Sequence, residues 1–238
     1  MCVVTIAWEA HPEWWLLVAG NRDEFHARAS APLGHWADNP QIIAGRDLVS
    51  GGGWIGVSET GRFAVVTNIR DADRPNPDKV SRGGLVADYL ATGHTPISLD
   101  VFNPFNLIVV GTENAHYLSN RPVPTSKVLA PGIHGLSNAI PNEYWPRKDR
   151  LDTAVADWFA KDATHPAELL DTLYDETSPD RDAHPIFIRS PVYGTRCSTV
   201  IAVDRKGQGQ IIERRFGADG TANGETALRF TWSAARPV

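Results

Sequence analysis

The chain has 238 residues and a formal net charge of −5, with 23 Lys and Arg against 28 Asp and Glu. This balance gives no basic surface of the kind that binds nucleic acid, and no Lys/Arg cluster that indicates an anionic membrane. No apolar run approaches the roughly 20 residues of a membrane-spanning helix, and charged residues interrupt any apolar signal sequence near the N-terminus. The two cysteines, Cys2 and Cys197, make no disulfide framework, so we expect a cytoplasmic protein.

Two pairs of β-rich runs predict hairpins in the first third of the chain. Val3–Trp8 and Trp14–Ala19 flank a turn-like stretch, and neither run alternates between apolar and polar residues. A strand that is apolar on both faces is covered on both faces, so we expect layers above and below this sheet. Further on, Gly53–Ser58 and Arg62–Asn68 flank Glu59-Thr60-Gly61, whose glycine suits a hairpin turn.

The rest of the chain mixes predicted helices with further strands. Ser81 is the expected N-cap of a helix that runs to about Ala91 and ends at Gly93. Other helices are predicted over residues 144–161, where apolar residues repeat at helical spacing, and over residues 166–174. The remaining predicted strands are residues 106–111, 116–119, 195–203, 210–216 and 227–232. Without a repeat or a dividing linker, this order predicts one α+β domain, residues 1–238, with two sheets stacked between helix layers.

The first hairpin directs attention to the second residue of the chain. If Met1 is removed, Cys2 becomes N-terminal, and its α-amine and thiol form a nucleophile–base pair. A hairpin in which residue 9 pairs near residue 14 places Cys2 opposite Asn21. A shift of one residue keeps Arg22 and Asp23 within reach. An Arg lowers a thiol pKa toward thiolate, and an Asp orients an ammonium group.

The second hairpin adds groups suited to an oxyanion hole. Its centre at Thr60 places Asn68 opposite Gly52, beside the glycine run at residues 51–53. Oxyanion holes use Asn side chains and closely approaching backbone N–H groups. Composition alone favours a solvated turn for residues 21–24 and a bulge or tight turn for the glycines. The catalytic interpretation gains weight because the hairpin returns the polar residues 21–24 to Cys2.

A series of short motifs runs in order from residue 1 to about residue 203. They are Met1-Cys2, Asn21-Arg22-Asp23-Glu24, Gly52-Gly53-Trp54-Ile55-Gly56, Thr67-Asn68-Ile69-Arg70, Gly135-Leu136-Ser137-Asn138, Trp145-Pro146 and Tyr193-Gly194-Thr195-Arg196. Together they resemble the NRDE family, the family of the transport and Golgi organisation protein 2. The resemblance implies a four-layer αββα sandwich of the N-terminal-nucleophile (Ntn) hydrolase type.

More distantly, the motifs are similar to those of the cysteine Ntn hydrolases that cleave conjugated bile salts and penicillin V. That similarity implies a catalytic set formed by Cys2, Arg22, Asp23, Asn68, Asn138 and Arg196. The chain departs from the family at Cys197, where relatives often carry Ser. Strand alternation predicts that Cys197 points away from the face lined by Arg196, which favours a buried structural thiol over a resolving cysteine.

Two functions of different classes follow from the resemblance. In the first, the Cys2 thiolate attacks a linear non-peptide amide or thioester, Asn68 and Asn138 stabilise the oxyanion, and no cofactor is required. In the second, the protein binds and traffics haem or acyl-CoA/lipid without catalysis, because family members have been connected with these ligands. The residues expected to bind such a ligand are Asn21, Arg22, Glu24, His26 and Arg70.

Two further expectations concern what the chain lacks. A purely structural module, filled by its many Trp residues, would leave the clustered polar residues 21–24 unexplained. The 8 His are scattered without a metal-binding spacing, so no metal site is predicted.

Overall fold

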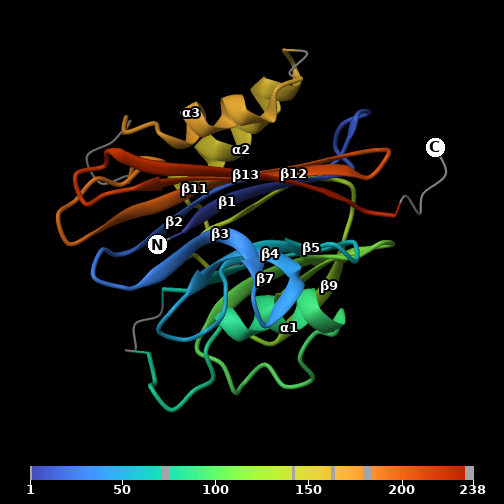
Figure 1. Ribbon diagram of the computed structural model, residues 1–238. Coiled ribbons are helices and arrows are strands. Elements are labelled where there is room, and N and C mark those ends of the chain that lie inside the picture. The colour runs from blue at the N-terminus through green and yellow to red at the C-terminus, as the bar shows by residue number, and fades with distance from the viewer. Residues whose placement is uncertain (1, 71–74, 141–142, 162–163, 179–183, 234–238) are drawn as a thin grey trace. The chain divides into compact units, whose positions relative to one another are not determined.

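The computed structural model describes residues 2–70, 75–140, 143–161, 164–178 and 184–233. The chain forms two compact units. The first unit comprises Met1–Ala27, Pro131–Ser137 and Tyr144–Val238, and the second comprises Arg28–Ala130 and Asn138–Glu143. Each unit contains one antiparallel sheet with helix packed on it (Figure 1). Among the described residues, none of the helices has the length and apolar character needed to cross a membrane.

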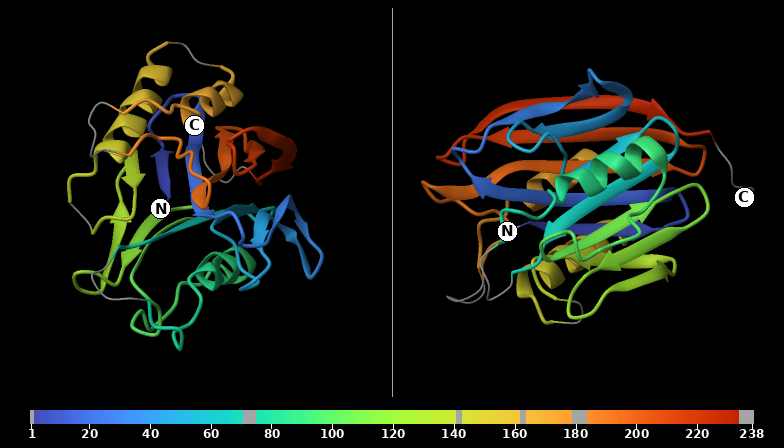
Figure 2. Two further views of the ribbon diagram at one scale, coloured as in Figure 1. Left: turned by 90° about the vertical axis from the view of Figure 1, so that its left-hand side faces the viewer. Right: turned by 90° about the horizontal axis from the view of Figure 1, so that it is seen from below.

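The first unit is built on a six-stranded sheet in the order β10-β1-β2-β11-β12-β13. Its strands are β1 (Val3–Trp8), β2 (Trp14–Phe25), β10 (Gly132–Leu136), β11 (Tyr193–Asp204), β12 (Gln208–Phe216) and β13 (Ala222–Thr231). Its helices are α2 (Pro146–Phe159), the 3-10 helix η1 (Pro166–Glu168) and α3 (Leu169–Leu173). The helices lie on one face of this sheet (Figures 1 and 2), where Leu151 and Val155 of α2 share a buried cluster with Val3, Leu17 and Val200 of the strands.

The second unit is a seven-stranded meander in which every strand pairs with the next in sequence. Its strands are β3 (Ser30–Trp36), β4 (Asn39–Asp47), β5 (Ile55–Ser58), β6 (Arg62–Asn68), β7 (Phe105–Val110), β8 (Ala115–Ser119) and β9 (Thr125–Leu129). Helix α1 (Gly83–Thr92) connects β6 to β7 and packs on one face of this sheet. Its buried residues lie in one cluster with Ala64 and Leu107 of the strands; they are Leu85, Val86, Tyr89 and Leu90.

Both predicted hairpins are present, and their strands are covered as expected. Every residue of β1 is buried, as a strand covered on both faces requires. Pairing of Ile55 with Val65 confirms the centre of the second hairpin at Thr60. Helix α1 ends at Gly93, whose φ of 77° is the left-handed conformation that favours glycine. Its N-cap is Arg82, however, and not Ser81 as predicted, because the helix begins one residue later.

Four strands lie where none was predicted: β3, β4, β9 and β10. β3 contains Pro32 and Gly34, and its pairing with β4 is irregular between Ala31 and Gly34. β9 and β10 have five residues each and carry polar residues or glycines that weaken a strand pattern. Pairing with neighbouring strands, rather than local sequence preference, therefore determines these strands.

Candidate functional site

The first hairpin is one residue away from its predicted register. The first residue of β1 pairs with Asn21, so the next position toward the N-terminus, Cys2, lies opposite Arg22. The shift arises in the turn, where the Glu9 N–H donates to the carbonyl of Trp15 at 2.9 Å and Glu9 adopts a φ of 48°. The predicted pairing of Cys2 with Asn21 is therefore wrong, and Arg22 takes that place.

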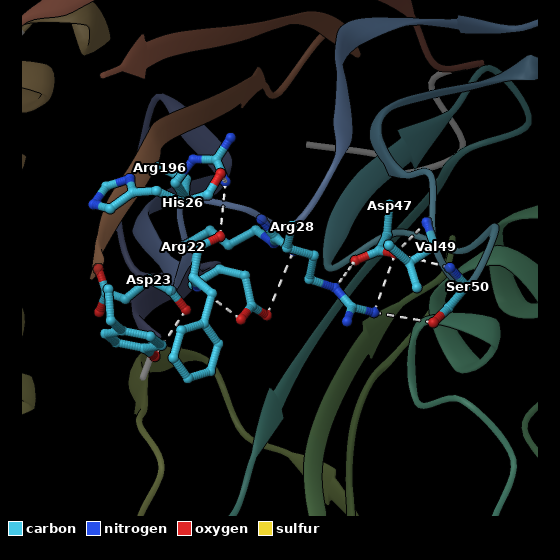
Figure 3. Close-up of polar contacts among 11 residues, drawn as sticks. Arg22, Asp23, His26, Arg28, Asp47, Val49, Ser50 and Arg196 are labelled. Carbon is cyan, nitrogen blue, oxygen red and sulfur yellow. Dashed lines mark hydrogen bonds and ion pairs between the residues drawn. The ribbon is translucent and has the colours of Figure 1, made fainter. Parts of the chain in front are cut away.

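Strand alternation divides residues 21–24 between the two faces of the sheet. The side chains of Asn21 and Asp23 point to the helices, since Asn21 bonds to the carbonyl that ends α3 and Asp23 pairs with α2. Arg22 lies on the opposite face (Figure 3), and the register of the hairpin places Cys2 on that face as well. Glu24 follows on that face, with a carboxylate oxygen 3.7 Å from the Arg22 guanidinium.

Asn21 is fully buried and holds three segments together. Its Nδ2 donates to the carbonyls of Leu173 and Ile186 at 2.8 and 2.9 Å. Its Oδ1 accepts from the Ser198 hydroxyl at 2.7 Å. These bonds hold the fold together. They use the Asn21 amide groups that the sequence predicted would bind a ligand.

Asp23 is held by a buried ion pair that the sequence did not reveal. Its carboxylate lies 2.5 Å from Nη1 of Arg147, and both side chains are at most 3% exposed. The other carboxylate oxygen accepts from the Thr195 hydroxyl at 2.7 Å. Arg147 also donates to the carbonyl of Ile186. Together these bonds fix α2 to β2 and β11. The only sequence signal for Arg147 was its position directly after the Trp145-Pro146 motif.

Arg196 and His26 lie together at the end of β2 (Figure 3). Arg196 is the extra residue of a β-bulge and donates to the carbonyls of Phe25 and His26 at 2.9 and 3.0 Å. The Nε2 of His26 lies 2.9 Å from the carbonyl of Ser190, to which it donates a hydrogen bond. The Arg196 and His26 side chains therefore stabilise the backbone at the end of β2 through hydrogen bonds.

The bulge at Arg196 also reverses the predicted orientation of Cys197. With Arg196 left out of the ladder, Cys197 pairs directly with Arg22. Residues paired across a ladder share a face, so Cys197 lies on the face of Arg22 and Cys2, and the prediction that it points away is wrong. Its side chain is buried, and burial raises the pKa of its thiol well above the ordinary value.

The surroundings of the Cys2 thiol favour its protonated form. Burial raises its pKa, and the Asp23 carboxylate adds to the rise. The positive charge at the N-terminus, the Arg22 guanidinium and the backbone N–H of Asp23 lower the pKa without cancelling this rise. A base must therefore remove the proton before Cys2 attacks an electrophile.

Arg22→Met is expected to slow alkylation of Cys2 at every pH below its pKa. Loss of the guanidinium removes a charge that lowers the thiol pKa, so less thiolate is present at a given pH. The rate of iodoacetamide labelling, followed from pH 6 to 10 by peptide mass spectrometry, measures this. Arg28→Met, which removes a guanidinium paired with Asp47 in the second unit, is the control and leaves the rate unchanged. A faster rate in Arg22→Met contradicts the assignment.

In the second unit, the structure brings two of the predicted asparagines together. The Nδ2 of Asn138 donates to the backbone carbonyl of Asn68, and the Arg70 N–H donates to the carbonyl of Asn138 at 2.7 Å. Asn138 is buried, whereas the Asn68 and Arg70 side chains are exposed. Within the described ranges, one hydrogen of the Asn138 amide and both hydrogens of the Asn68 amide have no acceptor.

The β5–β6 ladder has the predicted register but ends before the glycine run reaches Asn68. β5 begins at Ile55, and Asn68 pairs with Phe105 of β7. Gly52 instead packs against Gly83 at the start of α1, where a Cβ on Gly52 would lie 2.3 Å from the Gly83 carbonyl carbon. The Gly53 N–H donates to the Gly83 carbonyl at 3.2 Å. The run therefore allows close backbone approach between the β4–β5 connection and α1.

The connection between β4 and β5 is fixed by Asp47 (Figure 3). Its carboxylate accepts from the Arg28 guanidinium at 2.5 Å and from the backbone N–H groups of Val49 and Ser50 at 3.0 and 2.9 Å. Arg28 also reaches the Ser50 hydroxyl at 3.0 Å. In the described part of the chain, no three His, Cys, Asp or Glu side chains gather closely enough to hold a metal ion.

Known proteins resemble this chain in both sequence and fold. The family described as Transport and Golgi organisation 2 matches residues 1–218. The Transport and Golgi organization 2 homolog of Mus musculus is 30% identical over 269 residues, which cover 95% of this chain and 97% of that protein.

Two solved structures have a similar fold at low sequence identity. The Caenorhabditis elegans ortholog of N-acylethanolamine-hydrolyzing acid amidase has a TM-score of 0.53 at 14% identity and covers 84% of this chain and 92% of its own. A variant of conjugated bile acid hydrolase from Clostridium perfringens has a TM-score of 0.51 at 8% identity. The match covers 100% of this chain and 99% of the hydrolase chain. Both have the Ntn-hydrolase fold, which confirms the predicted fold class. With its family match over residues 1–218, the chain belongs to the Transport and Golgi organisation 2 family.

Proposed function

We propose that this protein is a cysteine hydrolase of the Ntn type that cleaves a linear, non-peptide amide or thioester. The proposal rests above all on the position of Cys2, which directly precedes β1 and lies opposite Arg22. Two proteins of the same fold, one that hydrolyses N-acylethanolamines and one that hydrolyses conjugated bile acids, support the choice of substrate class.

In the proposed reaction, the N-terminal residue supplies both nucleophile and base. Loss of Met1, which lies outside the described residues, frees the α-amine of Cys2. The α-amine accepts the thiol proton while Sγ attacks the carbonyl carbon, and it returns that proton to the leaving amine or thiol. Water then attacks the resulting acyl-thioester, which releases the carboxylic acid and regenerates the Cys2 thiol.

The remaining residues of the proposed set act on charge and position. The resemblance assigns Asn68 and Asn138 to the oxyanion, and that role is supported by the amide hydrogens that no described residue accepts. Arg22 acts on the Cys2 thiol by its charge, which opposes the rise in its pKa. Asp23 and Arg196 are positioning residues, because their side chains bond to Arg147 and to backbone carbonyls.

Cys2→Ala is expected to lower kcat/KM by at least about 10³-fold on any substrate that the wild type cleaves, because it removes the atom that forms the acyl-enzyme. The measurement compares processed wild type and variant on N-acyl amides and acyl-CoA thioesters. Cys197→Ala, which removes the other cysteine, is the matched control and retains activity. Equal turnover by wild type and Cys2→Ala contradicts the proposal.

A second candidate, binding and trafficking of haem or acyl-CoA without catalysis, is favoured by the Arg70 side chain. It is exposed, and among the described residues it makes no ion pair, which suits a phosphate or propionate. In the same experiment, palmitoyl-CoA and haem are titrated into wild type and Arg70→Gln. Binding that Arg70→Gln weakens, without turnover by wild type, supports this second function over the first.

A further inference from the structure

β13 ends the sheet of the first unit and leaves a long edge (Figure 2). It runs over ten residues and pairs with β12 on one side only. On one of its faces the side chains of Glu225, Ala227 and Arg229 are exposed, whereas Phe230 on the other face is buried. The outer backbone groups of such an edge are a template for another strand.

The charges on this edge are complementary to themselves. If a second copy of β13 pairs antiparallel about a two-fold axis through Ala227, Glu225 of each copy lies directly opposite Arg229 of the other. In the same register Phe230, whose ring packs on Gly209 of its own chain, lies opposite Gly224, which has no side chain to obstruct the pairing. Opposite charges directly across a ladder attract, and only this register places both pairs opposite each other.

The surroundings of Glu225 and Arg229 in a single chain leave both side chains able to contact a second copy. Arg229 makes no ion pair among the described residues. Glu225 lies 2.8 Å from the Arg214 guanidinium and is still 48% exposed. In the paired arrangement each Glu225 would therefore lie between Arg214 of its own copy and Arg229 of the other.

Another edge of the structure does not share this property. β9, at one end of the second sheet, has Lys127 at its centre, so two copies paired about that centre would oppose like charges. Natural edge strands use such charges to prevent pairing. In the register centred on Ala227, the charges of β13 instead attract a second copy of the strand. The β13 edge is therefore complementary to itself, whereas the β9 edge is protected against pairing.

We propose that the protein forms a two-fold dimer in which the β13 strands of two copies pair antiparallel and join their six-stranded sheets. The partner is a second copy of this chain, and the contact is isologous because the same strand serves both sides.

Charge reversal tests the dimer, with mass and dissociation constant measured by light scattering and sedimentation over a range of concentrations. The wild type is expected at twice the chain mass of 26.0 kDa. Arg229→Glu and Glu225→Arg each create two like-charge pairs in the dimer and are expected to raise the dissociation constant at least about tenfold. An equimolar mixture of the two variants restores opposite charges at both pairs, and the dimer returns as a heterodimer.

Two controls separate the proposal from misfolding and from other interfaces. Lys127→Glu on β9 is expected to leave the mass unchanged, and circular dichroism of all variants reports folding. A wild type that stays monomeric at every concentration overturns the proposal. So does a dimer that neither β13 variant weakens, or a mixture of the variants that remains monomeric.

Discussion

Arg147→Met is expected to lower the free energy of unfolding by about 3–5 kcal/mol, because it leaves a buried carboxylate without its counter-ion. The Asp23 and Arg147 side chains are 0% and 3% exposed, and the distance between them is 2.5 Å. The same guanidinium bonds to the carbonyl of Ile186, so the change also leaves a buried acceptor without this donor. Urea denaturation at neutral pH measures the loss.

The same helix provides a matched control for this prediction. Arg150 pairs with Asp175 at 2.6 Å, but these side chains are 25% and 32% exposed. Arg150→Met is therefore expected to cost at most about 1 kcal/mol. Asp23→Asn combined with Arg147→Met removes the uncompensated charge and is expected to be more stable than Arg147→Met alone. Equal losses from Arg147→Met and Arg150→Met would show that burial does not set the energy of the pair.

Gly52→Ala is expected to destabilise the second unit by about 3 kcal/mol, since the new methyl group has no space. The added Cβ would lie 2.3 Å from the carbonyl carbon and 2.8 Å from the Cα of Gly83. These are backbone atoms at the start of α1, so relief requires the helix to move away from the β4–β5 connection. Denaturant unfolding followed by circular dichroism measures the loss.

Gly84, a neighbouring glycine in α1, is the control for this substitution. A Cβ at Gly84 meets no atom within 4 Å. Because alanine restricts the unfolded chain and favours helix, Gly84→Ala is expected to be neutral or to stabilise by up to about 1 kcal/mol. If Gly52→Ala is as well tolerated as Gly84→Ala, the close packing of Gly52 on Gly83 does not hold in solution.

Local patterns in the sequence were sufficient for the elements with strong signals. Apolar runs without alternation predicted buried strands, and Gly61 and Gly93 marked a turn and a helix end that the structure contains. β3, β4, β9 and β10 could not be predicted this way, because glycine, proline and polar residues obscure their patterns. Those strands form because adjacent strands provide their hydrogen-bond partners.

For the candidate site, the sequence predicted that the end of the second strand lies beside Cys2, but not the direction of its side chains. A turn longer by one residue moved Cys2 from Asn21 to Arg22, and one bulge at Arg196 turned Cys197 to the same face. A shift of one residue changes the face of every side chain, and neither feature leaves a mark in composition. Arg147 was missed because its partner Asp23 lies 124 positions away in the sequence.

The central claim, that Cys2 is an N-terminal nucleophile, is tested most directly by the mass of the N-terminal peptide. Wild-type protein is mixed with an N-acyl amide or an acyl-CoA thioester, quenched in acid within one turnover and digested. The account predicts that Met1 is absent and that the acyl group is carried by Cys2. Turnover with Met1 still attached, or with the acyl group on Cys197 or on no residue, would contradict it.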